Sequence, residues 1–140
     1  MHILIADSGS TKTGWLLASV GDTAEGCVSH VFRTSGLNPC LMSDDDIACV
    51  LRDEVVPHLT GCCVGSLCFF GAGCTPSQTL RMATLLRGVL EVAAVEVMSD
   101  LEGAARALCG DREGVVAILG TGSGSGHYAG CRFVQPTPSV

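Results

Sequence analysis

The order in which apolar segments follow one another limits this chain to few folds. Three short apolar runs, at residues 2–7, 15–20 and 26–34, are separated by polar or glycine-containing turns. Short apolar runs joined by tight turns predict strands that pair in an antiparallel meander. Helical and extended patterns then alternate, in the order helix 43–59, strand 64–70, helix 75–90, strand 93–98, helix 101–109, strand 115–119 and a last strand around 127–134.

Local signals mark the ends of the predicted helices. Ser43, followed by three acids at residues 44–46, supplies the hydroxyl and the negative charges that favour a helix N-terminus. Thr75-Pro76 predicts the start of the second helix, because proline is tolerated at a first helical position. Gly110 predicts the end of the third.

The predicted fold class is α/β, in the ribonuclease-H-like layout. A first domain, residues 1–112, is expected to hold a mixed five-stranded sheet in which an antiparallel meander precedes α/β crossovers. Residues 113–140 fit poorly as a sixth strand of that sheet. They are expected to be the opening hairpin of a second, similar domain that is truncated here.

Composition excludes several classes of function. Apolar residues make up 47% of the sequence and charged residues 16%, which predicts a folded globule. The net charge is −6, Lys12 is the only lysine and the arginines are scattered, so nucleic acid is not an expected partner. No apolar run reaches the length of a membrane helix, and the first residues are interpreted as a strand rather than a signal peptide. A cytoplasmic protein without a membrane partner is therefore expected.

The nine cysteines include no C-x-x-C pair, and none is set against a histidine at zinc-finger spacing. Most lie within apolar stretches, where a reduced cysteine behaves as a small hydrophobic residue. They are interpreted as reduced core residues, and a metal or iron–sulfur role stays open as an alternative.

Candidate chemistry lies where strands end. Asp7 with the turn 8–13, Asp100, and the glycine-rich residues 120–125 each follow a predicted strand directly. Ligands of open α/β sheets collect at the carboxyl ends of strands. These three positions are therefore expected to lie together.

The turn at residues 8–13 joins two strands through small hydroxyl residues. Gly9 lets the backbone fold tightly, so that exposed N–H groups and hydroxyls could surround phosphate oxygens. Asp7 could hold Mg²⁺ through water, and a purely structural turn would not need an acid at the end of a buried strand. The turn is not a Walker A loop, because no glycine precedes Lys12 and a strand is expected to follow.

Five segments together carry a family resemblance. Residues 7–13 (Asp-Ser-Gly-Ser-Thr-Lys-Thr) resemble the first phosphate motif of the actin/hexokinase ATPase superfamily, and residues 120–123 (Gly-Thr-Gly-Ser) resemble the second. Within it, N-acetylglucosamine kinases and their BadF-type relatives have a sugar-contacting loop similar to Ser-Gly-Leu-Asn-Pro at 35–39. Residues 71–73 are similar to their glycine-rich strand end, and 99–105 to their catalytic aspartate segment. The matches occur in the family's order.

The resemblance implies an ATP-dependent kinase acting on the 6-hydroxyl of N-acetylglucosamine or a related amino sugar. Asp100 would accept the proton of that hydroxyl as its oxygen attacks the γ-phosphate of ATP, and Asp7 would hold Mg²⁺ through water. Asn38, Gly73 and Ser123 would bind the sugar. The residues expected to bind the ATP phosphates are Asp7, Ser8, Gly9, Ser10, Thr11, Lys12, Thr13, Gly120, Thr121 and Gly122. The expected partners are thus a small-molecule sugar and a nucleotide, and a homodimer is compatible with them.

Some positions depart from the family pattern. Ser8 and Ser10 replace glycines that are common in the wider superfamily, Gly14 stands where an aspartate usually precedes the tryptophan, and Gly124 stands where an asparagine is usual. Relatives also continue past the proline-containing residues 136–140 with a second domain that carries the adenosine pocket. The chain alone is therefore expected to have negligible kinase activity.

Other interpretations stay open. An ATP-dependent activator of a radical dehydratase or reductase shares the superfamily and uses cysteines to bridge a dimer through an iron–sulfur cluster. No cysteine follows Asp100 at the expected spacing, however, and Asn38-Pro39 favours a sugar. A domain that binds sugar or phosphate without catalysis is a second alternative. For Asp100 itself, the alternative is a helix N-cap with no catalytic role.

Overall fold

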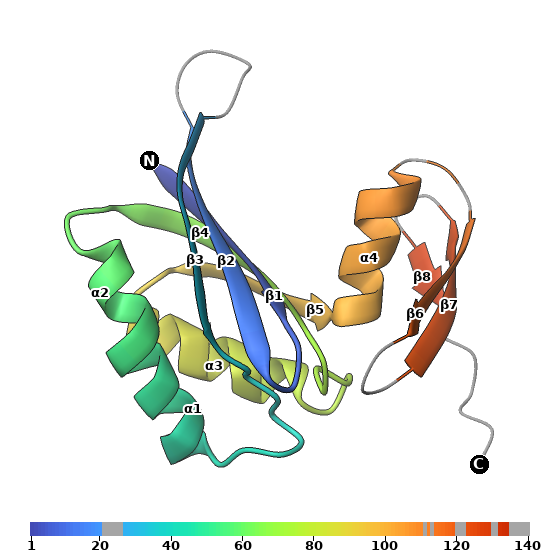
Figure 1. The fold of residues 1–140 in the computed structure, drawn as a ribbon, viewed down its shortest axis with the longest axis horizontal. Helices are drawn as coiled ribbons and strands as arrows, with labels where there is room; N and C mark the ends of the chain where they lie inside the picture. The colour runs from blue at the N-terminus through green and yellow to red at the C-terminus, as the bar shows by residue number, and fades with distance from the viewer. Residues whose placement is uncertain (21–26, 111, 113, 120–122, 130–131, 135–140) are drawn as a thin grey trace.

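A mixed five-stranded sheet forms the centre of the computed structural model, which describes residues 1–20, 27–110, 112, 114–119, 123–129 and 132–134. Its strands are β1 (His2–Ser8), β2 (Lys12–Ser19), β3 (Cys27–Ser35), β4 (Val64–Gly71) and β5 (Ala94–Ser99). They lie in the order β3-β2-β1-β4-β5 (Figure 1). β1 pairs with β2, and β2 with β3, in antiparallel fashion, whereas β1–β4 and β4–β5 are parallel. The predicted meander followed by crossovers is confirmed.

Helices form the longer connections between the strands of this sheet. α1 (Asp44–Val50), the π-helical turn η1 (Leu51–Val55) and α2 (Val56–Leu59) succeed one another without a break, and α3 (Thr79–Leu90) contacts α1 and η1 (Figure 1). α4 (Asp100–Cys109) leaves β5 directly and contacts β1, β4 and β5. α1 to α2 thus precede β4, and α3 connects the parallel strands β4 and β5, whereas α4 leads from β5 to the second sheet.

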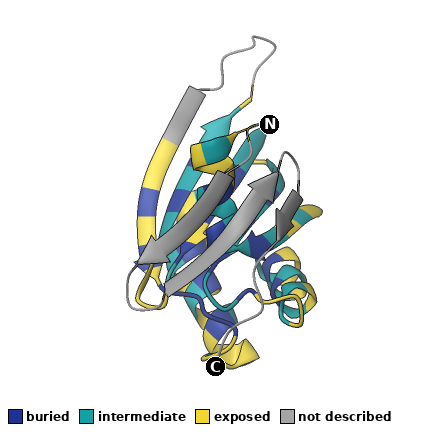
Figure 2. Cartoon of the chain, turned by 90° about the vertical axis from the view of Figure 1, so that its right-hand side faces the viewer, coloured by how far each residue is buried: buried dark blue, intermediate teal, exposed yellow. Residues whose placement is uncertain are grey.

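Alternation along the strands places the core on one face of the sheet. Leu4 and Ala6 of β1 are fully buried, whereas Ile5 between them is 39% exposed. The same alternation runs along the edge strand β3 (Figure 2). The buried strand residues pack with apolar helix residues such as Ile47 and Leu86. The core therefore lies between the sheet and the helices α1 to α3.

Trp15 joins three strands inside this core. Its indole ring is stacked with Phe32 of β3 and tilted against Phe69 of β4, with ring centroids 5.9 and 6.1 Å apart. The buried indole Nε1 donates a hydrogen bond of 2.9 Å to Thr34 Oγ1. The one polar atom of this large side chain is thus satisfied, so its burial carries no desolvation penalty.

The predicted helix ends agree with the structure at two of three places. Ser43 caps α1 by accepting a hydrogen bond from the backbone N of Asp46, and Gly110, at φ 56°, ends α4. The start predicted at Thr75-Pro76 is wrong, because α3 begins at Thr79. The hydroxyl of Thr75 contacts the hydroxyl two residues later, and the intervening backbone forms a turn before the helix.

A second, antiparallel sheet follows α4. It consists of β6 (Gly114–Leu119), β7 (Ser123–Ala129) and β8 (Arg132–Val134), so the predicted hairpin gains a third strand. α4 contacts β6 and β7 as well as the first sheet (Figure 1). The division into domains at residues 112 and 113 stays a prediction. In the part of the chain that the structure describes, no helix has the length and apolar character needed to cross a membrane.

Candidate functional site

Three strand ends meet at one edge of the five-stranded sheet. Ser8 of β1 lies beside Gly71 of β4, which lies beside Ser99 of β5. The three strands are parallel, so their carboxyl ends lie at the same edge, where open α/β sheets bind ligands. Asp7 and Asp100 flank this row. Two of the three positions expected to lie together are therefore neighbours.

The carboxylates of Asp7 and Asp100 lie close enough to affect each other. Asp7 is exposed although its neighbours Ala6 and Ser8 are buried, so it is on the face of β1 opposite the core. Its partial burial, and then the negative charge of Asp100, raise the pKa of Asp7 above the ordinary value of 3.8. Two carboxylates in this arrangement favour a cation or a shared proton between them.

Asp100 stands at the start of α4, and Ser99 caps that helix. Ser99 Oγ accepts a hydrogen bond of 3.1 Å from the backbone N of Glu102. Asp100 Oδ1 accepts one of 2.9 Å from the backbone N of Leu101. The alternative that Asp100 is the N-cap is therefore wrong. Asp100 is instead the first residue of α4, and its carboxylate lies among the free backbone N–H groups of that helix end.

Two hydroxyl residues of the first phosphate motif hold the turn between β1 and β2 in place. Ser8 and Thr13 are fully buried, with their hydroxyl oxygens 2.8 Å apart. Ser8 Oγ accepts a hydrogen bond of 3.0 Å from the backbone N of Leu37, and Thr13 Oγ1 donates one of 3.0 Å to the carbonyl of Ser35. These side chains therefore attach the turn to the loop after β3 rather than line its outer surface.

The remaining residues of the turn form an exposed tip. The backbone N of Gly9 donates to the carbonyl of Lys12 at 2.8 Å, which closes the turn. Ser10, Thr11 and Lys12 are all exposed. The tip therefore presents two hydroxyls and the only lysine of the chain, which are groups that bind phosphate oxygens.

The loop after β3 lies directly against this tip. The backbone N of Gly36 donates to the carbonyl of Thr11 at 3.1 Å. A Cβ added at Gly36 would lie 2.4 Å from the carbonyl oxygen of Ser10. Only glycine permits this close approach, so Gly36 fixes the spacing between the predicted phosphate turn and the predicted sugar loop.

Asn38 and Gly73, both predicted to bind the sugar, are in contact. Asn38 is 8% exposed, and its Nδ2 lies 3.4 Å from Ser10 Oγ. Its Oδ1 accepts a hydrogen bond of 3.0 Å from the backbone N of Cys40. A Cβ added at Gly73, whose φ is +75°, would lie 1.9 Å from Asn38 Oδ1. The amide is thus enclosed between the phosphate turn and the segment after β4.

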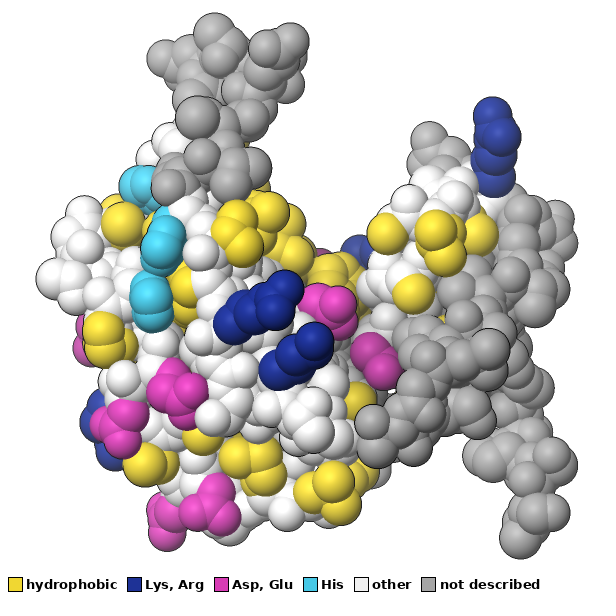
Figure 3. Space-filling model, in the orientation of Figure 1, with side chains coloured by type: hydrophobic (Ala, Val, Ile, Leu, Met, Phe, Trp, Pro, Cys, Tyr) yellow, Lys and Arg dark blue, Asp and Glu magenta, His cyan; other side chains and the backbone are white. Residues whose placement is uncertain are grey.

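A pocket of about 550 Å³ opens beside Asp100. Asp100 and Gly73 both line it. Figure 3 shows, in addition, that the surface of the molecule is hollowed between the five-stranded sheet and α4. The rest of its wall comes from Gly71, Cys74, Thr75, Pro76, Thr79, Val97, Met98, Ser99 and Glu102. Burial, then the charge of Asp100 and the nearby Cys40, raise the pKa of Cys74 to about 12. Cys74 is therefore a neutral part of this wall at physiological pH.

The second phosphate motif falls largely outside the described residues. Gly120, Thr121 and Gly122 lie outside them, and Ser123 is described only as the first residue of β7. Their roles in phosphate and sugar binding stay predictions.

Sequence reasoning missed several residues around the site. Thr75, Thr79 and Glu102 line the pocket, and Arg81 of α3 contacts the loop that contains Asn38. A cation in an amphipathic helix is usually solvent-exposed, so the sequence gives no signal for a partner of Arg81 39 residues away.

The donor atoms at this edge are hard oxygens. Among the residues that the structure describes, no group of three or more His, Cys, Asp or Glu is arranged to hold a metal ion. The neighbouring carboxylates of Asp7 and Asp100, with the raised pKa of Asp7, nevertheless fit a cation that keeps most of its water. Mg²⁺ binds in this way, through one or two carboxylates and substrate phosphates.

Comparison with solved structures supports the fold. A protein from Porphyromonas gingivalis, provisionally named N-acetylglucosamine kinase, superposes with a TM-score of 0.85 and 40% sequence identity over 95% of this chain. The chain spans 46% of the length of that protein. A Ppx/GppA enzyme from Aquifex aeolicus has a TM-score of 0.49 and 14% identity, over 95% of this chain and 50% of its own.

No protein-family model matches the chain, and no curated protein matches it. The chain has the ribonuclease-H-like fold of actin-like ATPases, and along nearly its whole length it resembles the Porphyromonas gingivalis protein provisionally named N-acetylglucosamine kinase, as its motifs predicted.

Proposed function

We propose that this chain forms the phosphate- and sugar-binding part of an ATP-dependent kinase that phosphorylates the 6-hydroxyl of N-acetylglucosamine or a related amino sugar. One observation carries the proposal. Asp100 lies at the same sheet edge as Asp7, beside a pocket that Gly73 also lines, and Gly73 encloses Asn38. An acid, a pocket and a phosphate-type turn thus adjoin one another. The 40% identity to the Porphyromonas gingivalis protein adds independent support.

Each group in this arrangement has a role in phosphoryl transfer. Asp100 accepts the proton of the sugar hydroxyl, while the pocket beside it holds the sugar ring. Asn38 donates and accepts hydrogen bonds with sugar hydroxyls. The exposed tip at Ser10, Thr11 and Lys12 binds phosphate oxygens. Because the transition state is loose, catalysis depends mainly on positioning and charge stabilisation rather than on a strong base.

The proposed reaction also uses Mg²⁺. Asp7 would hold the ion through water, and the bound ion would neutralise charge on the phosphates of ATP. Asp7 then positions the nucleotide, and Asp100 activates the sugar hydroxyl that accepts the phosphoryl group. A cytoplasmic location fits an ATP-dependent enzyme whose described cysteines are free thiols.

Binding to the isolated chain tests the sugar and phosphate assignments separately. In a titration of the ¹⁵N-labelled chain, N-acetylglucosamine should shift the amide signals of residues 36–40, 71–75 and 99–102. Magnesium pyrophosphate should shift those of residues 9–12. Asn38→Ala should abolish the first response and preserve the second. A response to pyrophosphate alone would favour the non-catalytic phosphate-binding alternative over the kinase.

The role of Asp100 as general base is tested by kinetics. In a form of the protein that phosphorylates sugar, Asp100→Asn should lower kcat about 10²- to 10⁴-fold, the usual contribution of a general base. Sugar binding should change little, because asparagine keeps the shape and the hydrogen-bonding capacity of the side chain. A kcat within a few-fold of the parent would contradict the assignment.

A further inference from the structure

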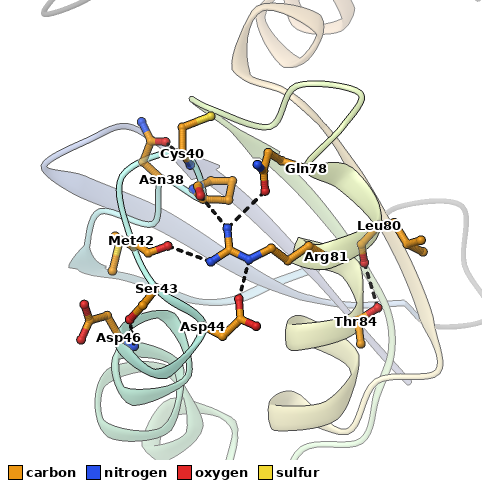
Figure 4. Close-up of polar contacts among 11 residues, drawn as sticks. Asn38, Cys40, Met42, Ser43, Asp44, Asp46, Gln78, Leu80, Arg81 and Thr84 are labelled. Carbon is orange, nitrogen blue, oxygen red and sulfur yellow. Dashed lines mark hydrogen bonds and ion pairs between the residues drawn. The ribbon is translucent and has the colours of Figure 1, made fainter.

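Arg81 of α3 directs its guanidinium into the loop that follows Asn38 (Figure 4). Nη1 donates to the carbonyl of Pro39 at 2.5 Å, and Nη2 donates to the carbonyl of Met42 at 2.7 Å. Nε pairs with the carboxylate of Asp44, the first residue of α1. A fourth contact, of 3.2 Å, joins Nη1 to Oε1 of Gln78, the residue that precedes α3. One side chain thus connects α3 to three points along residues 39–44.

These contacts differ from those of a simple surface ion pair. The Arg81 side chain is 29% exposed, whereas its partner Asp44 is 62% exposed, so the pair alone would add little stability. The carbonyls of Pro39 and Met42 belong to a turn outside any helix or strand. The rigid, planar fork of arginine satisfies both carbonyls and the carboxylate at once, a geometry that lysine cannot reproduce.

The turn that Arg81 braces is the one that fixes Asn38. The backbone N atoms of Leu41 and Met42 both donate to the carbonyl of Asn38 at 3.0 Å. The side-chain Oδ1 of Asn38 accepts from the backbone N of Cys40 at 3.0 Å. Every residue from 38 to 42 therefore takes part in one hydrogen-bonded turn, and Arg81 contacts its beginning and its end.

We propose that Arg81 is a positioning residue, which holds the 38–42 turn so that the Asn38 amide stays between Ser10 and Gly73 and is ready to receive the acceptor substrate. Arg81 acts through the turn, since within the described part of the chain its hydrogen bonds reach no residue that lines the pocket. The substrate part of this inference rests on the proposed function, whereas the ordering of the turn does not.

Amide hydrogen exchange on the 140-residue chain tests the ordering directly. Arg81→Lys keeps a positive charge near Asp44 but cannot span both carbonyls. Exchange at Leu41 and Met42 should then accelerate roughly tenfold or more, as expected for the loss of charge-assisted hydrogen bonds. Arg87→Lys is the matched control, because Arg87 lies on the same helix and its Nε reaches the carbonyl of Ala93 instead. It should leave exchange at these two amides unchanged.

Ligand binding separates positioning from plain structural support. With Arg81→Lys, the affinity for N-acetylglucosamine should fall roughly tenfold, as expected for a loosened contact, while that for magnesium pyrophosphate stays constant. Unchanged exchange at Leu41 and Met42, or acceleration spread equally over α3 and the sheet, would overturn the proposal. If the parent chain binds no sugar, the proposed function fails, and the exchange result still decides whether Arg81 orders the turn.

Discussion

Gly73 shows how one backbone conformation can fix a binding residue. Its φ of +75° lies in the left-handed region, and an added Cβ would lie 1.9 Å from Asn38 Oδ1. Gly61 has a similar φ of +80°, but an added Cβ there would meet nothing within 4 Å. Alanine variants at the two positions therefore distinguish the cost of backbone strain, which both share, from the cost of displacing Asn38, which arises only at Gly73.

Alanine at these positions should have different consequences. Gly61→Ala should lower the free energy of unfolding by about 1–2 kcal/mol, the usual cost of a left-handed alanine. Gly73→Ala should cost more than this and should also abolish the response to N-acetylglucosamine, because Asn38 must move. Urea unfolding and sugar titration measure the two effects. Equal stability losses with sugar binding intact would show that Asn38 is not held by Gly73.

The Asp7 carboxyl gives a pH dependence whose sign follows from its raised pKa. Partial burial and the charge of Asp100 make the folded protein hold the Asp7 proton more tightly than the unfolded chain does. The contribution of Asp7 to stability therefore falls as the pH rises from the ordinary value of 3.8 through the raised pKa, and it stays low above that.

Asp7→Asn should accordingly stabilise the protein at pH 7 in metal-free buffer. The gain should shrink as the pH falls through the raised pKa and should vanish below the ordinary value of 3.8, where the parent carboxyl is protonated in both states. The free energies of unfolding of the parent and of Asp7→Asn, measured with a chemical denaturant between pH 3 and 8, give this difference. Asp45→Asn, at an exposed position on α1, is the control for general charge effects. A destabilised Asp7→Asn at neutral pH would contradict a pKa of Asp7 that is raised by burial and by the charge of Asp100.

At the scale of elements, two serine caps allow a matched comparison. Ser43 caps α1 and Ser99 caps α4, each by accepting a hydrogen bond from the backbone N three residues later. Alanine at either position should lower the free energy of unfolding by about 1 kcal/mol. Only Ser99→Ala should also weaken sugar binding, because the next residue is Asp100. Equal sugar affinity in the two variants would show that the start of α4 does not depend on its cap.

The elements themselves were largely predictable because their signals are local. A short apolar run bounded by polar residues, such as residues 2–7, identifies a strand, and Ser43 before three acids identifies a helix start. The start of α3 was mispredicted because Thr75-Pro76 has the composition of a cap, yet its hydroxyl contacts a side chain instead. Propensity cannot distinguish these two uses of the same residues.

The candidate site was predictable in its location but not in its contacts. The edge at Asp7 and Asp100 followed from the order of the strands. The burial of Ser8 depends on Leu37, 29 residues away, and the contacts of Arg81 depend on a turn 39 and 42 residues away. Such pairings exist only once the sheet and helices have packed, so no local pattern indicates them.

For the molecule as a whole, the site lies at the margin of the described fold. On the face of the sheet opposite the core, α4 covers only part of the surface: Gly103 lies against the ring of Phe70, while Val31 is 63% exposed. The pocket beside Asp100 and the exposed tip of the first turn both lie at the edge of the sheet where β1, β4 and β5 end. The proposed kinase reaction needs water to be excluded from this space.

The chain alone should therefore show negligible kinase turnover, and weak binding of sugar and of pyrophosphate should remain. Its 140 residues correspond to 46% of the Porphyromonas gingivalis protein, and the resemblance assigns the adenosine pocket to the remaining part of such proteins. Phosphoryl transfer depends on holding both reactants at once, so a site that holds only one of them should lose most of the rate while it keeps some of the binding.

An assay for sugar phosphate tests this prediction, with the purified chain, N-acetylglucosamine and magnesium ATP in the reaction. Calorimetry should show no gain in affinity from pyrophosphate to ATP if, as the resemblance implies, residues 1–140 contact only the phosphates. Turnover at ordinary kinase rates, of about 1–100 s⁻¹, would mean that residues 1–140 already assemble a complete site.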